Sequence, residues 1–116
     1  LFRSFTGEIR RKEVVLREHL AALTREFAEV EMKVRGRGLI YGLEMPSAVQ
    51  AKAISREAFK RGLIIELAGS EDQVVKFLPP LVVEEAVLQR GLDILAESLR
   101  VSLSGTRATS IAQRAA

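Results

Sequence analysis

One short run of this chain holds a β-hairpin and a double proline, and it limits the folds that the rest can join. The run covers residues 60–92 and reads KRGLIIELAGSEDQVVKFLPPLVVEEAVLQRGL. Two apolar segments flank a polar loop at 68–72, which predicts antiparallel strands over 63–67 and 73–78. The pair Pro79–Pro80 offers no N–H groups to a sheet ladder, so the second strand must end there. The chain therefore contains a sheet.

Apolar stripes at helical spacing predict three helices around this hairpin. The first covers about 8–30, the second opens at Ser47 as a capping box with Gln50, and the third covers about 84–99. The N-cap of the third helix falls on Val82 or Val83. A β-favouring segment at 39–45 predicts a further strand. The stripes consist of Leu16, Leu20, Leu23, Phe27 and Val30, then Ala51, Ile54 and Ala58, then Leu88, Leu92, Leu95 and Leu99.

This order of elements predicts an α+β fold, with helices on one face of a small, mainly antiparallel sheet. Residues 1–100 form this domain, and the small, polar segment 101–116 is expected to be a flexible tail.

Composition excludes several classes of function. The 116 residues carry a net charge of +3 and no cysteine, which excludes disulfides and thiol catalysis and fits a cytoplasmic protein. No apolar run approaches the roughly 20 residues that span a bilayer, so no membrane partner is expected. Basic residues of the first half alternate with acids along a helix, and aromatic residues are few, so we expect no nucleic-acid partner.

Few side chains suggest chemistry of their own. The single histidine, His19, has no second histidine or cysteine at ligand spacing, so it is interpreted as a helix-surface residue and no metal is expected. The segment Arg35-Gly36-Arg37-Gly38 lacks the spacing of phosphate-binding loops and is interpreted as a turn with exposed arginines. No complete catalytic set is present.

Lys76 is the exception, because a cation rarely stands inside an apolar strand. Val75 and Phe77 flank it, so strand geometry points its side chain to the face opposite theirs. Three interpretations stay open from the residues alone. Lys76 is an edge-strand lysine that prevents sheet-to-sheet pairing, a cation that receives an anionic substrate group, or a Schiff-base lysine.

Four segments together resemble a known family. VRGRGLIYGLEM, AFKRGLI, VVKFLPPLVVEE and GLDIL are similar in order and spacing to the C-terminal domain of class III aminotransferases, over roughly residues 8–99. These enzymes have the aspartate-aminotransferase type of pyridoxal-phosphate fold. Within the class, the chain is most similar to diaminobutyrate–2-oxoglutarate aminotransferases, of the branch that serves ectoine synthesis or, as the other option, of the siderophore-associated branch.

The resemblance implies a homodimeric pyridoxal 5'-phosphate enzyme that transfers the 4-amino group between L-2,4-diaminobutyrate and 2-oxoglutarate. In many members an arginine before the F-x-P-P-L segment binds the substrate carboxylate, and Lys76 occupies the matching position. Lysine supplies a point charge there instead of a planar fork.

The cofactor-binding lysine of the family belongs to a large domain that this chain lacks. The chain is therefore expected to be an inactive C-terminal fragment with no catalytic residue of its own. The alternative is a stand-alone α+β module that binds a ligand or regulates another protein.

Overall fold

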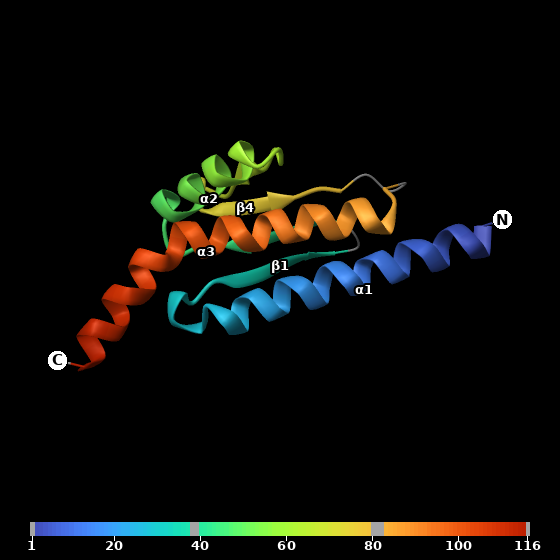
Figure 1. Ribbon diagram of the computed structural model, residues 1–116. Helices are drawn as coiled ribbons and strands as arrows, with labels where there is room; N and C mark the ends of the chain where they lie inside the picture. Colours follow the sequence, from blue (N-terminus) through green and yellow to red (C-terminus); the bar gives the residue numbers. More distant parts are fainter. Residues whose placement is uncertain (1, 38–39, 80–82, 116) are drawn as a thin grey trace.

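The fold has two layers, with three helices packed on one face of a four-stranded sheet (Figure 1). This computed structural model describes residues 2–37, 40–79 and 83–115. The elements in chain order are α1 Phe2–Glu26, the 3₁₀ helix η1 Ala28–Val30, β1 Lys33–Arg37, β2 Ile40–Glu44, α2 Ala48–Lys60, β3 Glu66–Ala68, β4 Val74–Phe77 and α3 Glu85–Ala115. The strands lie in the order β1-β2-β4-β3, and each neighbouring pair is antiparallel. The predicted α+β architecture is confirmed.

The alternation of each strand divides its residues between two faces. Tyr41 pairs with Phe77 and Leu43 pairs with Val75, and all four side chains are at most 7% exposed beneath the helices. The strand residues between them point away from the helices. We call this side of the sheet the open face, and its described residues are Lys33, Arg35, Ile40, Gly42, Glu44, Glu66, Ala68, Val74 and Lys76.

Helix α1 is longer at its start and shorter at its end than the sequence predicts. It begins at Phe2, and its stripe of Leu16, Leu20 and Leu23 is buried against the core. The helix ends at Glu26, and a single 3₁₀ turn follows before the chain enters β1.

The turn predicted at the Arg-Gly-Arg-Gly segment is wrong, because Lys33–Arg37 forms the edge strand β1. Val34 explains the difference, since it lies opposite Leu43 and packs against the core. The polar residues on either side of Val34 then fall on the open face. The last residue of the segment, Gly38, and the next residue lie outside the described residues.

Helix α2 begins where the sequence predicts, directly after Ser47. Ser47 caps it by accepting a hydrogen bond from the backbone N–H of Gln50 at 3.4 Å, and its buried stripe is Ala51, Ile54 and Ala58. In the last turn, Glu57 accepts hydrogen bonds from Arg61 at 2.7 Å and Lys60 at 3.1 Å. These bonds hold the pKa of Glu57 below its ordinary value, and the bond from Arg61 has the larger effect.

The predicted hairpin is confirmed, although β3 and β4 are shorter than expected. Its loop uses left-handed backbone at Gly69 (φ 92°) and at Asp72 (φ 58°). The strand β4 stops at Phe77, and the second proline and the next two residues lie outside the described residues.

Helix α3 continues far beyond the predicted end at Leu99. It begins at Glu85, so the cap position is Glu84, whose carbonyl accepts the N–H of Leu88 at 2.9 Å, rather than Val82 or Val83. The helical backbone extends to Ala115, through the segment predicted to be a flexible tail. Leu103 adds a further buried position to the stripe.

Candidate functional site

Lys76 lies in the middle of the open face. It directly opposes Gly42 of β2 on one side and Glu66 of β3 on the other. Its neighbours Val75 and Phe77 are buried at 1% and 7% exposure, so the predicted orientation of Lys76 away from the core is confirmed. The side chain is half-buried, and no hydrogen bond or ion pair to it occurs among the described residues. The open face thus presents an uncommitted cation.

The position of β4 in the sheet rules out one of the three interpretations of Lys76. β4 pairs with β2 on one side and with β3 on the other, so it is an inner strand of the sheet. An inner strand has no free edge to protect against further pairing. The interpretation of Lys76 as an edge-strand lysine is therefore wrong.

A second cation, Arg35, stands on the open face two strands away. Arg35 directly opposes Gly42, which in turn opposes Lys76. Its Nη2 donates to Oε1 of Glu44 at 3.2 Å. From the sequence, Arg35 is interpreted only as an exposed turn arginine and Glu44 is given no role, but the alternation of Lys33-Val34-Arg35 along a strand would have placed Arg35 on this face.

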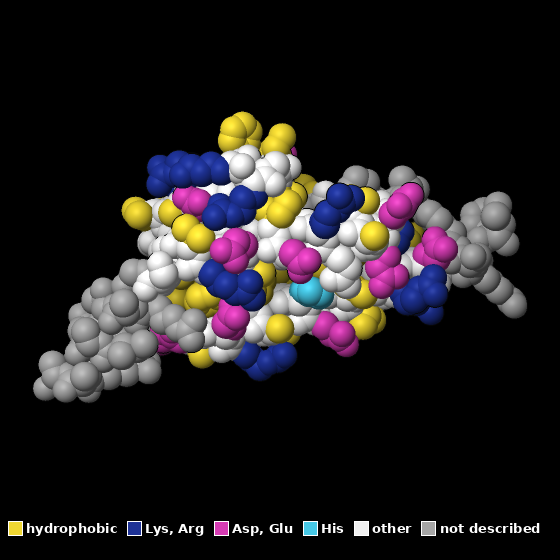
Figure 2. All heavy atoms as spheres, in the orientation of Figure 1, with side chains coloured by type: hydrophobic (Ala, Val, Ile, Leu, Met, Phe, Trp, Pro, Cys, Tyr) yellow, Lys and Arg dark blue, Asp and Glu magenta, His cyan; other side chains and the backbone are white. Residues whose placement is uncertain are grey.

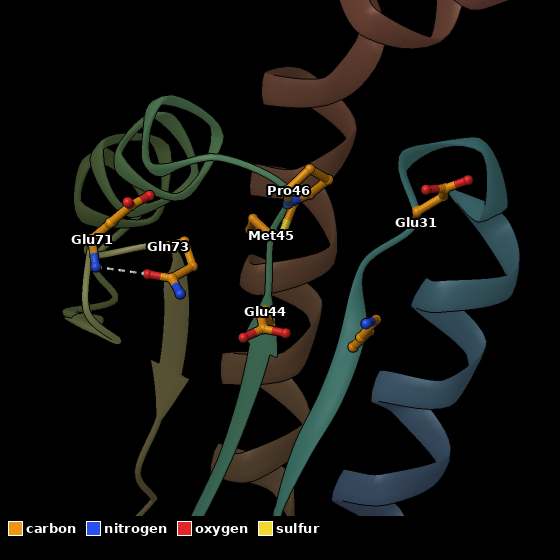
Figure 3. Close-up of a pocket in the computed structure, with 7 residues that line it drawn as sticks. Glu31, Glu44, Met45, Pro46, Glu71 and Gln73 are labelled. Carbon is orange, nitrogen blue, oxygen red and sulfur yellow. Dashed lines mark hydrogen bonds between the residues drawn. The ribbon is translucent and has the colours of Figure 1, made fainter.

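A polar hollow lies at one end of the open face (Figure 3). Figure 3 shows Glu44 at the centre of the hollow, with Glu31 on the α1 side and Glu71 on the hairpin side. The backbone N–H of Glu71 donates to Oε1 of Gln73 at 3.0 Å. Across the described residues, no three histidine, cysteine or acidic side chains are arranged to hold a metal ion. The lining residues are Glu31, Lys33, Glu44, Met45, Pro46, Glu71 and Gln73.

His19 lies half-buried in a groove between α1 and α3, on the opposite side of the molecule from the open face (Figure 2). Asp93 and Glu97 of α3 line the same groove. Further along, Arg100 of α3 donates to Glu26 of α1 at 3.3 Å and so links the two helices. The groove shares no residue with the open face.

Among the described residues, none of the lysines has surroundings suited to hold pyridoxal phosphate. A Schiff-base lysine needs a desolvating pocket that lowers its pKa. Every lysine of the chain is exposed or half-buried, including Lys76. The interpretation of Lys76 as a Schiff-base lysine therefore has no support in its surroundings. Within the described part of the chain, no helix is both long and apolar enough to cross a bilayer.

Comparison of the sequence with known proteins identifies its relatives. Residues 3–99 match the family model of class-III aminotransferases. A diaminobutyrate–2-oxoglutarate transaminase of Wolinella succinogenes is 50% identical over 97 residues, which are 83% of this chain and 23% of that protein. A transaminase of the same name from Oceanobacillus iheyensis is 39% identical over 100 residues, which are 86% of this chain and 24% of that protein.

Solved structures with the same fold include two aminotransferases. A lysine aminotransferase from M. tuberculosis in its internal aldimine form aligns with a TM-score of 0.76 and 26% identity, over 86% of this chain and 22% of that chain. N-acetylornithine aminotransferase from Stenotrophomonas maltophilia aligns with a TM-score of 0.75 and 29% identity, over 88% of this chain and 28% of that chain.

The chain spans about a quarter of the length of the relatives that it matches. The sequence match nonetheless covers all the strands, α2 and most of α1, as well as α3 up to Leu99. The chain belongs to the class-III aminotransferase family.

Proposed function

We propose that this chain is the C-terminal small domain, residues 1–100, of a cytoplasmic, homodimeric transaminase of ectoine synthesis. The full-length enzyme transfers the 4-amino group between L-2,4-diaminobutyrate and 2-oxoglutarate. The relatives from Wolinella succinogenes and Oceanobacillus iheyensis, both diaminobutyrate–2-oxoglutarate transaminases, support this pair of substrates. Pyridoxal phosphate, held by a lysine outside this chain, supplies the electron sink for amino transfer when it is bound. The chain alone is inactive, because it provides no such lysine.

The contribution of this chain is to bind a substrate carboxylate through Lys76. One observation carries this proposal. Lys76 is held on an inner strand, points to the helix-free face and has no partner among the described residues. A rigid strand fixes the backbone of Lys76, so the ammonium group needs little reorganisation to meet a carboxylate. Lysine acts there as a point charge.

The test is kinetic and uses the full-length enzyme with Lys76→Gln. Loss of a hydrogen bond to a charged group costs about 1.5–3 kcal/mol, so the KM for one carboxylate substrate should rise about 10- to 100-fold. Lys76→Arg keeps the charge and should retain much of the affinity. Lys52→Gln, on the exposed side of α2, is the matched control and should leave both KM values unchanged.

An unchanged KM for both diaminobutyrate and 2-oxoglutarate in Lys76→Gln would exclude carboxylate binding by Lys76. Failure of the full-length enzyme to transaminate this pair would exclude the substrate assignment. Sedimentation of the full-length enzyme tests the dimer separately, because a monomeric active enzyme would contradict only that part of the proposal.

A further inference from the structure

Two cations of the open face stand in one row across the sheet. Arg35 of β1 opposes Gly42 of β2, and Gly42 opposes Lys76 of β4. Directly paired residues project on the same side of a sheet, so the side chains of Arg35 and Lys76 share the open face. Two strand spacings separate their backbones by about 10 Å. Both side chains are long enough to reach toward the space between them.

The strip between the two cations has an apolar cover. Gly42 brings no side chain to it, and Cγ1 of Val74 would lie only 2.7 Å from a Cβ atom at Gly42. The valine methyl group therefore lies over the glycine, between Arg35 and Lys76. Two cations that flank a small apolar surface match a molecule with two carboxylates and a short methylene chain between them.

Arg35 already binds a carboxylate in this structure. Its guanidinium donates to Glu44, which belongs to the next row of the open face, opposite Lys33. The Arg35 side chain is 61% exposed and that of Glu44 is 30% exposed. Such exposed ion pairs contribute only about 0–1 kcal/mol, so an incoming carboxylate can replace Glu44 at little cost. Arginine also offers a planar fork, which suits two-point binding of a carboxylate.

The charges around the row do not cancel this attraction. Glu66 opposes Lys76 on the side away from Gly42, at the other edge of the row. The acid therefore stands outside the space between the two cations. A diacid placed over Val74 meets Arg35 at one end and Lys76 at the other.

We propose that Arg35 is a second carboxylate-binding residue of the Lys76 site, and that the two cations together select a dicarboxylate over a monocarboxylate. This inference rests on the proposed function, because it names the class of amino acceptor that the same site takes. Lys76 alone would bind any carboxylate. Arg35 adds a contact that only the second carboxylate of a diacid can use.

The test compares two acceptors of the full-length enzyme, 2-oxoglutarate and the monocarboxylate pyruvate. Arg35→Gln should lower kcat/KM for 2-oxoglutarate about 10- to 50-fold and change that for pyruvate less than about threefold. Arg35→Lys should recover part of the loss. Arg17→Gln is the matched control, because Arg17 is also exposed and paired with a glutamate, Glu13, but lies on α1. An equal loss for both acceptors, or none for either, would overturn the proposal.

A second variant, Glu44→Gln, should strengthen diacid binding instead of weakening it. Glu44→Gln removes the internal competitor of Arg35, so it should raise the affinity for glutarate about two- to fivefold. A role of the Arg35–Glu44 pair in folding alone predicts no such gain. A weaker affinity for glutarate in Glu44→Gln would also count against the proposal.

Calorimetric binding of glutarate separates this inference from the proposed function, because it requires no turnover. Wild-type enzyme that binds glutarate at least tenfold more tightly than Arg35→Gln, yet does not transaminate diaminobutyrate, would refute only the proposed function. An active wild-type enzyme with the same glutarate affinity as Arg35→Gln would refute only the role of Arg35. Wild-type enzyme that does not bind glutarate would also refute that role.

Discussion

The two faces of the sheet come from the same strands but have different characters. Beneath the helices, Tyr41, Leu43 and Val75 are at most 5% exposed and belong to one apolar core. On the open face, Arg35 and Lys76 lie among further charged residues, Gly42 and a few apolar side chains such as the exposed Ile40. Alternation at a period of two produces this separation, since each strand contributes to both faces.

If the open face binds substrate as proposed, stability and recognition reside on opposite sides of one thin layer. Burial of apolar surface stabilises the helix-covered face, and each large side chain there contributes about 1.5–3 kcal/mol. The open face holds charges whose mutual interactions are weak in water. Substitutions on the two faces should therefore have separable effects on folding and on ligand binding.

Leu92→Ala should have the largest effect on stability. Leu92 is fully buried in α3, and truncation of such a residue costs about 2–5 kcal/mol through lost burial and the cavity that remains. Chemical denaturation of the chain measures this cost. Val87→Ala on the same helix is the control, since Val87 is 43% exposed and should cost well under half as much. Equal costs at the two positions would contradict the assignment of the core.

Gly42→Ala tests how closely strands β2 and β4 pack on the open face. The new Cβ would lie 2.7 Å from Cγ1 of Val74 and 3.4 Å from the carbonyl oxygen of Val75, so strand β2 or β4 must shift. Such overpacking costs about 1–3 kcal/mol. The double variant Gly42→Ala/Val74→Ala should recover most of that loss, because the shorter side chain removes the clash. A double variant that is less stable than either single one would contradict this packing.

The helix-covered face was largely predictable from sequence, because its signal is local. The spacing of Leu16, Leu20 and Leu23 alone predicts a buried helix stripe, and all three residues are buried. Flanking residues Val75 and Phe77 likewise fixed the side to which Lys76 points. Helix ends were less predictable, since α3 continues helically past Leu99 with small residues that neither favour nor forbid a helix.

The open face was predictable only in part, because its residues meet through strand pairing. Arg35 and Lys76 are far apart in sequence and adjoin only because β2 lies between β1 and β4. That strand order depends on long-range pairing, which no local pattern specifies. The same dependence concealed the fact that Lys76 stands on an inner strand rather than an edge.

The Arg35–Glu44 pair should contribute little to stability, in contrast to the core positions. A double-mutant cycle with Arg35→Ala and Glu44→Ala should give a coupling free energy of about 0.2–1 kcal/mol in the unfolding of the chain. Added salt should reduce this coupling, because both groups are in contact with solvent. A coupling above about 2 kcal/mol would mean that Glu44 is too firmly held to yield its place to a substrate.

Lys76→Gln should have the smallest effect on stability of all, although its effect on KM should be among the largest. Lys76 is half-buried and has no ion pair among the described residues, so the free energy of unfolding should change by no more than about 0.5 kcal/mol. Denaturation of the chain and of its Lys76→Gln variant under identical conditions measures the difference. A loss above about 1.5 kcal/mol would show that Lys76 supports the sheet itself. In that case a raised KM would report a disturbed fold. The separation of stability on the helix-covered face from binding on the open face would then not hold for Lys76.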